Sequence, residues 1–309
     1  MKKSIFLSFI LCLCLVACIP QQAMAQKQSR MEKLLRYLND NDADKWQKNR
    51  EKLDDETKAY YAEDLSLMDV LNDLWNGQSE QAATLYFGCY EKAAQNNFPS
   101  ICEGEKIPLS QIRDKADQSI INLLEASKDK IPFSRALLDS IHATEYPVDS
   151  AMLQRLQNIR EVALLEGMLK APTPIIYQTY VKEYPNGKFI AQVNASENVR
   201  LYQLVKTTPT PANFKAFFED PEMQKYYQDR GPRPYLAEVR TLYDDFLFQR
   251  IDSLKKEGNA TAIRQIIDDY KNTPYLATGA RTHLNDLEYL SEKADFELLK
   301  PAIVNSESL

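Results

Sequence analysis

The sequence predicts an all-α protein built from helical hairpins, and three observations support that prediction. Apolar residues recur every three or four positions along most of the 309 residues, which is the period of an amphipathic helix. The chain has only 8 glycines, and apolar and polar residues never alternate over a convincing run, which disfavours strands. The second half repeats a short motif, and each copy precedes a long amphipathic stretch.

The first 25 residues are expected to be a cleaved signal peptide. Lys2 and Lys3 form a positive n-region, and residues 5–17 form a continuous apolar h-region. This apolar run is shorter than the roughly 20 residues that a membrane-spanning helix needs. Ala23-Met24-Ala25 is a small-x-small cleavage site before Gln26. We therefore expect an exported protein that is free in the periplasm.

A second interpretation of this segment gives the protein a lipid anchor. Leu15-Val16-Ala17-Cys18 resembles the lipobox of bacterial lipoproteins, in which the cysteine is acylated and becomes the first residue. Cys18 is then the candidate lipidation site, and the protein is lipid-anchored to the outer membrane. The alternative treats Cys18 as a small apolar residue of the signal, like Cys12 and Cys14. Both interpretations take the chain out of the cytoplasm.

The charge balance argues against a nucleic-acid partner. Cleavage after Ala25 removes two of the 38 basic residues and none of the 44 acidic residues, so the formal charge changes from −6 to −8. Nucleic-acid phosphates require a basic surface. No cofactor or metal is expected either, since no Gly-x-Gly pattern exists for a phosphate. His142 and His283 are also far apart and stand in no zinc motif.

Two cysteines remain after the predicted signal peptide, Cys89 and Cys102. An oxidising periplasm permits a disulfide between them across an apparent loop. The alternative is two unpaired thiols, with Cys89 on the apolar face of a helix. Such a bridge would stabilise the fold and would not be catalytic, because redox chemistry favours Cys-x-x-Cys spacing.

The repeat divides the chain into an N-terminal helical region at 26–130, helical repeats at 131–295 and a tail at 296–309. An aromatic-aliphatic-alanine motif occurs three times, at 46 and 40 residues of separation, in Phe189-Ile190-Ala191, Tyr235-Leu236-Ala237 and Tyr275-Leu276-Ala277. Each copy is expected to begin a long helix. Ile190, Leu236 and Leu276 should occupy equivalent buried positions near the starts of these helices.

A shorter helix is expected before each long one. Two of these begin at Thr173-Pro174 and Thr210-Pro211. Threonine is a good N-cap, and proline suits the first helical position, where its missing N–H would have no intrahelical partner. Helical hairpins of about 40 residues cannot bury their apolar faces alone, so we expect them to stack as a solenoid.

The segment from Tyr184-Pro185 to Ile190-Ala191 resembles the Tyr-Pro-x-Ser/Gly-x-Phe/Tyr element of tetratricopeptide-type repeat proteins of the bacterial envelope. These include the lipoprotein of the outer-membrane assembly machine. The resemblance covers about residues 134–293 and is sharpest in the first repeat. It implies a curved solenoid whose groove binds a protein or peptide partner. The repeat spacing is not the strict 34 residues of that family, so the resemblance supports an architecture more than a role in barrel assembly.

The middle repeat is longer than the others, and its extra residues form a candidate partner-binding loop. Tyr226, Tyr227, Arg230 and Arg233 supply aromatic and basic side chains there, and inserted loops of solenoids often lie at a binding face. The alternative is a tolerated surface insertion.

The sequence contains no recognisable catalytic motif, so we expect a scaffold and not an enzyme. The other function considered is a glycan- or cell-wall-acting enzyme that uses a carboxylate pair. Adjacent acids are frequent, as in Asp244-Asp245 and Asp268-Asp269, although solvated helix faces also explain them. A deep pocket with two convergent acids, one of them shielded by aromatic rings, would favour the enzyme.

Overall fold

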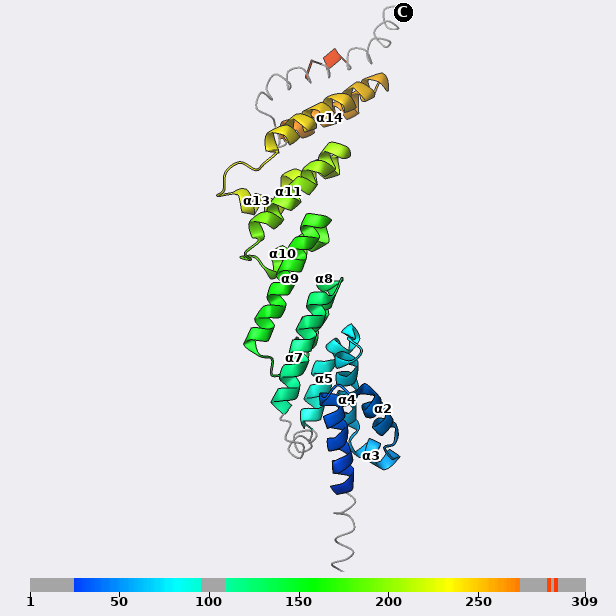
Figure 1. The fold of residues 1–309 in the computed structure, drawn as a ribbon. Helices are drawn as coiled ribbons and strands as arrows, with labels where there is room; N and C mark the ends of the chain where they lie inside the picture. Colours follow the sequence, from blue (N-terminus) through cyan, green and yellow to red (C-terminus); the bar gives the residue numbers. More distant parts are fainter. Residues whose placement is uncertain (1–24, 96–108, 273–287, 290–291, 294–309) are drawn as a thin grey trace, which may run out of the picture. The chain divides into compact units, whose positions relative to one another are not determined.

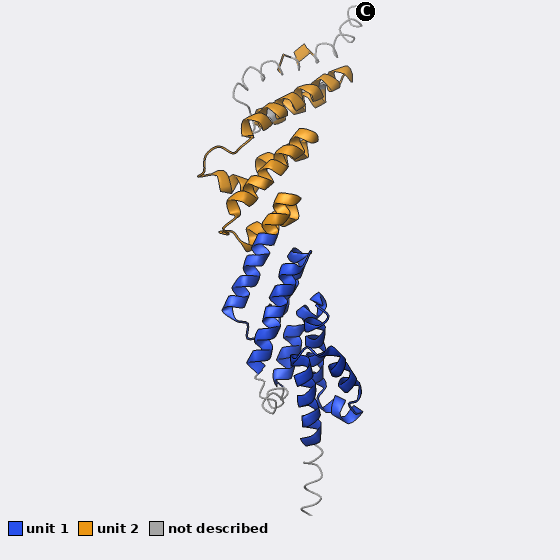
Figure 2. Ribbon diagram, in the orientation of Figure 1, with its two compact units in different colours: residues 1–163 blue, residues 164–309 orange. Residues whose placement is uncertain are grey.

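The computed structural model describes residues 25–95, 109–272, 288–289 and 292–293, and these residues form helices and no strand (Figure 1). The all-α prediction is confirmed. No helix within these ranges combines the length and apolar character needed to cross a membrane. The chain divides into two compact units, residues 1–163 and 164–309 (Figure 2). The division falls within helix α9 (Ser150–Lys170).

Unit 1 is a helical bundle around one continuous apolar core. Residues 25–39 are helical. They are followed by α2 (Ala43–Glu51), α3 (Asp55–Tyr60), α4 (Ala62–Trp75), α5 (Glu80–Gln95), α7 (Leu109–Ala126), α8 (Lys130–His142) and the first part of α9. The helices α4 and α5 form a tightly packed hairpin, and α5 also packs on α7 and α8.

The turn between α4 and α5 depends on a glycine. A Cβ at Gly77 would lie 2.8 Å from the carbonyl oxygen of Asp73. That oxygen also accepts the backbone N–H of Gly77 at 3.1 Å, which brings the two residues close together. A larger residue would therefore push against the last turn of α4.

Unit 2 alternates short and long helices. After the end of α9 it contains α10 (Pro174–Glu183), α11 (Ile190–Thr207), α12 (Pro211–Glu219), α13 (Pro221–Tyr227), α14 (Leu236–Lys256) and α15 (Ala260–Asn272). The two predicted Thr-Pro starts are confirmed. Thr173 Oγ1 accepts the N–H of Ile176 at 3.3 Å, and Thr210 Oγ1 accepts that of Asn213 at 3.2 Å.

The long helices α11 and α14 bury equivalent positions, all 46 residues apart. These pairs are Val193 and Val239, Leu201 and Leu247, and Val205 and Ile251. The sequence analysis placed the buried position at Ile190 and Leu236, which is one turn too early. Both side chains are only half-buried. Both are the first residues of their helices, where fewer neighbours surround a side chain, whereas the valines three positions later are fully enclosed. Leu276 lies outside the described residues.

The unequal spacing of the motif copies comes from extra residues between α12 and α14. The caps Thr173 and Thr210 are 37 residues apart, whereas Val193 and Val239 are 46 apart, so nine extra residues lie between α12 and α14. Helix α13 and the segment after it accommodate them. The extra residues that the sequence places between Thr210 and Tyr235 therefore form α13 and the segment that leads to α14.

Candidate functional site

A cleft of about 500 Å³ lies in unit 2 among α10, α11, α12 and the start of α13. Its lining combines apolar side chains with charged groups of both signs. The apolar and aromatic residues are Pro174, Tyr177, Leu201, Ala212, Ala216 and Pro221, and the polar ones are Gln178, Glu197, Arg200, Lys215, Glu219 and Asp220. A groove of this composition suits an amphipathic peptide segment.

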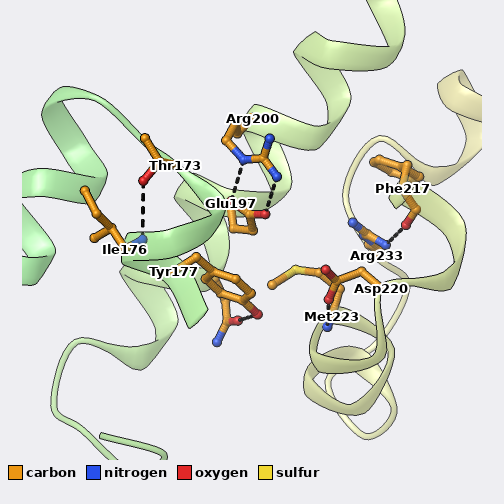
Figure 3. A network of polar contacts seen from close by, with 10 residues as sticks. Thr173, Ile176, Tyr177, Glu197, Arg200, Phe217, Asp220, Met223 and Arg233 are labelled. Atoms are coloured by element: carbon orange, nitrogen blue, oxygen red, sulfur yellow. Dashed lines mark hydrogen bonds and ion pairs between the residues drawn. The ribbon is translucent and has the colours of Figure 1, made fainter. Parts of the chain in front are cut away.

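Each short helix at the cleft begins with a capping side chain followed by a proline. Thr173-Pro174 begins α10 and Thr210-Pro211 begins α12, and Asp220-Pro221 begins α13. The Asp220 Oδ1 accepts the N–H of Met223 at 2.8 Å, and Figure 3 shows this cap and the Thr173 cap as separate contacts. The cap occupies an N–H that would otherwise have no partner, and proline fixes the first turn. The walls of the cleft are therefore preorganised.

Tyr177 forms a buried part of the wall. Its hydroxyl donates to Asn194 Oδ1 at 2.9 Å, and Asn194 Nδ2 donates to the carbonyl oxygen of Ile190 at 2.8 Å. Burial raises the pKa of Tyr177, and the charges of Asp220 and Glu197 raise it further. The phenol is thus a neutral donor that joins α10 to α11.

The most buried charge at the cleft is Glu197, which is 1% exposed. Arg200 neutralises it through two hydrogen bonds, from Nε to Oε2 at 2.7 Å and from Nη2 to Oε1 at 2.6 Å (Figure 3). The bond to Glu197 raises the pKa of Arg200. A guanidinium has five N–H donors, so Arg200 retains donors for a ligand in the cleft after binding Glu197.

Arg233, which the sequence analysis placed in a partner-binding loop, is buried instead. Its Nε donates to Asn198 Oδ1 at 2.6 Å, its Nη1 donates to the carbonyl oxygen of Phe217, and its guanidinium lies 4.0 Å from the centroid of the Phe217 ring. Burial lowers the pKa of Arg233 to about 10. Arg233 therefore fastens the inserted segment to α11 and α12.

The other three loop residues lie nearer the surface. Tyr226 and Tyr227 end α13 as half-buried rings 5.0 Å apart, edge to face. Exposed Arg230 stacks 4.5 Å from the Tyr226 ring centroid and donates to the Tyr226 carbonyl oxygen at 2.8 Å. Arg233 is therefore buried, whereas Tyr226, Tyr227 and Arg230 lie nearer the surface. That these three residues contact a partner stays a prediction.

The cysteine predictions fall mainly outside the described residues. Cys18 and Cys102 are not among them, so neither lipidation nor the disulfide is addressed. Cys89 is half-buried in α5, and its Sγ lies 3.6 Å from Ser66 Oγ. The described part of the chain contains no group of three or more His, Cys, Asp or Glu side chains suited to a metal ion.

Unit 1 contains a separate cleft of about 490 Å³, beside a buried acid. Asp117 is 7% exposed and accepts a hydrogen bond from the Tyr146 hydroxyl at 2.5 Å. The Tyr146 ring packs edge to face against Tyr86, Phe87 and Tyr90. Burial raises the pKa of Asp117 to about 6. Exposed Asp114 and Asp149 line the same cleft, together with Arg113 and Arg155.

Sequence reasoning found two of the helix starts at the unit 2 cleft, Thr173-Pro174 and Thr210-Pro211, but neither the start of α13 at Asp220-Pro221 nor the side chains that line the cleft. Tyr177, Arg200 and Lys215 carry no motif, and the three Thr-Pro or Asp-Pro starts were the available signal. Asp117 was also missed, because it stands apart from the adjacent acids in the sequence. Comparisons with protein-family models, curated proteins and solved structures found no match for the chain.

Proposed function

We propose that this protein is an exported helical-repeat scaffold that binds a segment of a protein partner in the unit 2 cleft. The observation that carries the proposal is the cleft itself, about 500 Å³ between three preorganised helices and lined by apolar and charged side chains together. The signal-like first 25 residues support export to the periplasm, or anchoring at the outer membrane through Cys18. The matching burial patterns of α11 and α14 support a tetratricopeptide-like repeat.

The lining indicates the chemistry of the partner segment. Glu197 and Arg200 cancel each other, and Lys215 lies 3.8 Å from Glu219. Asp220 is left as an additional negative charge in the lining. The preferred segment therefore carries an apolar anchor beside a basic residue. Burying one apolar side chain contributes about 1.5–3 kcal/mol, which alone supports weak and reversible binding.

The test blocks the cleft without touching the core. Ala212 is exposed in the first turn of α12 and lines the cleft, so Ala212→Trp would fill it. Ala237 is exposed in the first turn of α14 and is not in the lining, so Ala237→Trp is the matched control. A photo-crosslinking residue at exposed Gln178 reports on the partner in cells of the native host. We expect one specific adduct that Ala212→Trp abolishes and Ala237→Trp retains. An adduct that survives both substitutions would refute the assignment of the cleft.

The second candidate function is a glycan- or cell-wall-acting enzyme, and Asp117 is the observation that favours it. A carboxyl shielded by aromatic rings, with a pKa near 6, has the properties of a general acid, and exposed Asp149 lines the same cleft. The assay is turnover of peptidoglycan and soluble polysaccharides by the purified chain. This function requires turnover that Asp117→Asn and Asp149→Asn each abolish. Turnover that is absent, or unchanged in both variants, excludes it.

A further inference from the structure

A third cleft, of about 250 Å³, lies in unit 1 beside the end of α4, the following turn and α7. Its lining contains several amide side chains and a single charged residue, Lys115. The lining residues are Asn41, Leu74, Trp75, Gln78, Lys115, Ser119, Asn122, Leu123 and Ala126. The lining contains no acid, so the one formal charge in this cleft is positive.

The ammonium group of Lys115 has only neutral partners. Its Nζ donates to the Asn39 carbonyl oxygen at 2.7 Å and to Asn41 Oδ1 at 3.0 Å, and it lies 3.9 Å from the centroid of the Trp75 ring. No carboxylate lies within ion-pair distance of this nitrogen in the described parts of the chain. Lys115 is half-buried, and burial lowers its pKa. The carboxylate of Asp40 offsets part of this effect through space, but it forms no ion pair with Lys115. A partly desolvated cation without a contacting counter-charge is costly, so an anion at this place is favoured.

The amides of the cleft are oriented as donors. Asn41 Oδ1 accepts from Lys115, and Asn122 Oδ1 accepts from Gln118 Nε2 at 2.6 Å. Because both amide oxygens are engaged, the two NH₂ groups are what Asn41 and Asn122 offer to a ligand. The bond from the ammonium to the Asn41 oxygen also polarises that amide and makes it a stronger donor.

Two residues of the lining, Asn41 and Gln78, have a left-handed backbone, with φ of 56° and 48°. Each follows the end of a helix, where a residue in this conformation commonly closes the last turn. The backbone N–H of Asp42 donates to the Tyr37 carbonyl oxygen at 2.9 Å, and that of Ser79 donates to the Asp73 carbonyl oxygen at 3.2 Å. These helix ends therefore fix the backbone that carries both side chains at the cleft.

We propose that this cleft binds a carboxylate group, which accepts hydrogen bonds from the Asn41 and Asn122 amides and neutralises the charge of Lys115. The carboxylate comes either from a small free organic acid or from the C-terminus of a peptide. The proposal concerns unit 1 and does not depend on peptide binding in unit 2.

The experiment uses Trp75 as the reporter. The chain has two tryptophans, so Trp46→Phe leaves Trp75 as the single tryptophan, beside Lys115, and excitation at wavelengths that tyrosine does not absorb selects it. The full chain is titrated at constant ionic strength with sodium acetate, with N-acetyl-Ala-Ala, and with the same dipeptide amidated at its C-terminus. Sodium chloride is the reference. Calorimetric titration of the chain that retains Trp46 serves as a second measurement.

We expect saturable binding of a free carboxylate and none of the amidated peptide. Binding of acetate identifies the small acid as sufficient, whereas binding of the dipeptide acid alone identifies a peptide C-terminus. Responses no different from those to chloride in both measurements, or equal binding of the acid and the amide, would overturn the proposal.

Two substitutions locate the site. Asn122 is exposed, so Asn122→Asp should fold, and its added negative charge should weaken binding at least about tenfold, a free-energy change of about 1.4 kcal/mol. Asn186→Asp, at an exposed turn of unit 2, is the charge-matched control and should change nothing. Lys115→Met keeps an apolar chain over Trp75 and should abolish binding. Unchanged affinity in Asn122→Asp and Lys115→Met would place the ligand elsewhere and overturn the proposal.

Discussion

The substitution Asp64→Asn should change how the stability of unit 1 depends on pH. Asp64 is 2% exposed in α4, and its Oδ1 has no hydrogen-bond partner in the described structure. Burial raises the pKa of this carboxyl from 3.8 to about 7, and neighbouring Glu63 adds to the increase. The folded protein therefore retains a proton on Asp64 that the unfolded chain releases above about pH 4.

The direction in which the free energy of unfolding changes with pH depends on whether the folded or the unfolded state binds more protons. Below about pH 4, Asp64 is protonated in both states and has no effect. Between about pH 4 and pH 7 the folded state holds the extra proton, so the free energy of unfolding falls as the pH rises. Each unit of pKa corresponds to about 1.4 kcal/mol, so the loss reaches at most about 4 kcal/mol and is complete above pH 7. An asparagine is neutral throughout and avoids this loss.

The assay is urea denaturation of the wild-type chain and the variant from pH 4 to pH 8, followed by tryptophan fluorescence. Trp46 and Trp75 both belong to unit 1, so the signal reports its unfolding. We expect Asp64→Asn to gain stability relative to the wild type as the pH rises. Asp73→Asn, at an exposed aspartate of the same helix, is the control and should show no such gain. A difference between Asp64→Asn and the wild type that is constant over the pH range would refute the reasoning.

Three further predictions concern the fold and are checked by thermal or urea denaturation. Gly88→Ala in α5 meets no atom within 4 Å and should stabilise by about 0.5–1 kcal/mol, whereas Gly77→Ala should destabilise because its Cβ would meet the Asp73 carbonyl. If Gly77→Ala were instead more stable than Gly88→Ala, the α4–α5 turn would tolerate a side chain. Thr210→Ala should cost about 1 kcal/mol through loss of the α12 cap, and Thr210→Ser should restore most of it. Leu247→Ala should cost about 2–5 kcal/mol, and a loss below about 1 kcal/mol would contradict its buried position in α14.

Local chemistry in the sequence was sufficient to predict that the chain is helical and where several of its helices begin. The Thr-Pro starts at Thr173 and Thr210 became capped helices. The shared motif at Ile190 and Leu236 correctly marked the starts of two long helices. These features depend on the few residues around each position, because capping bonds and the helical period involve neighbours three or four positions away.

The tertiary structure decided which side chains of those helices are buried and which charges meet. A period of three to four residues defines the apolar face of a helix but not where along that face a neighbouring helix packs, so Val193 and Val239, and not Ile190 and Leu236, are the enclosed residues. Arg233 reads as a surface cation until Asn198, 35 residues away, is placed beside it. The pKa of a group and the shape of a cleft depend on such distant contacts, and a single sequence contains no local signal for them.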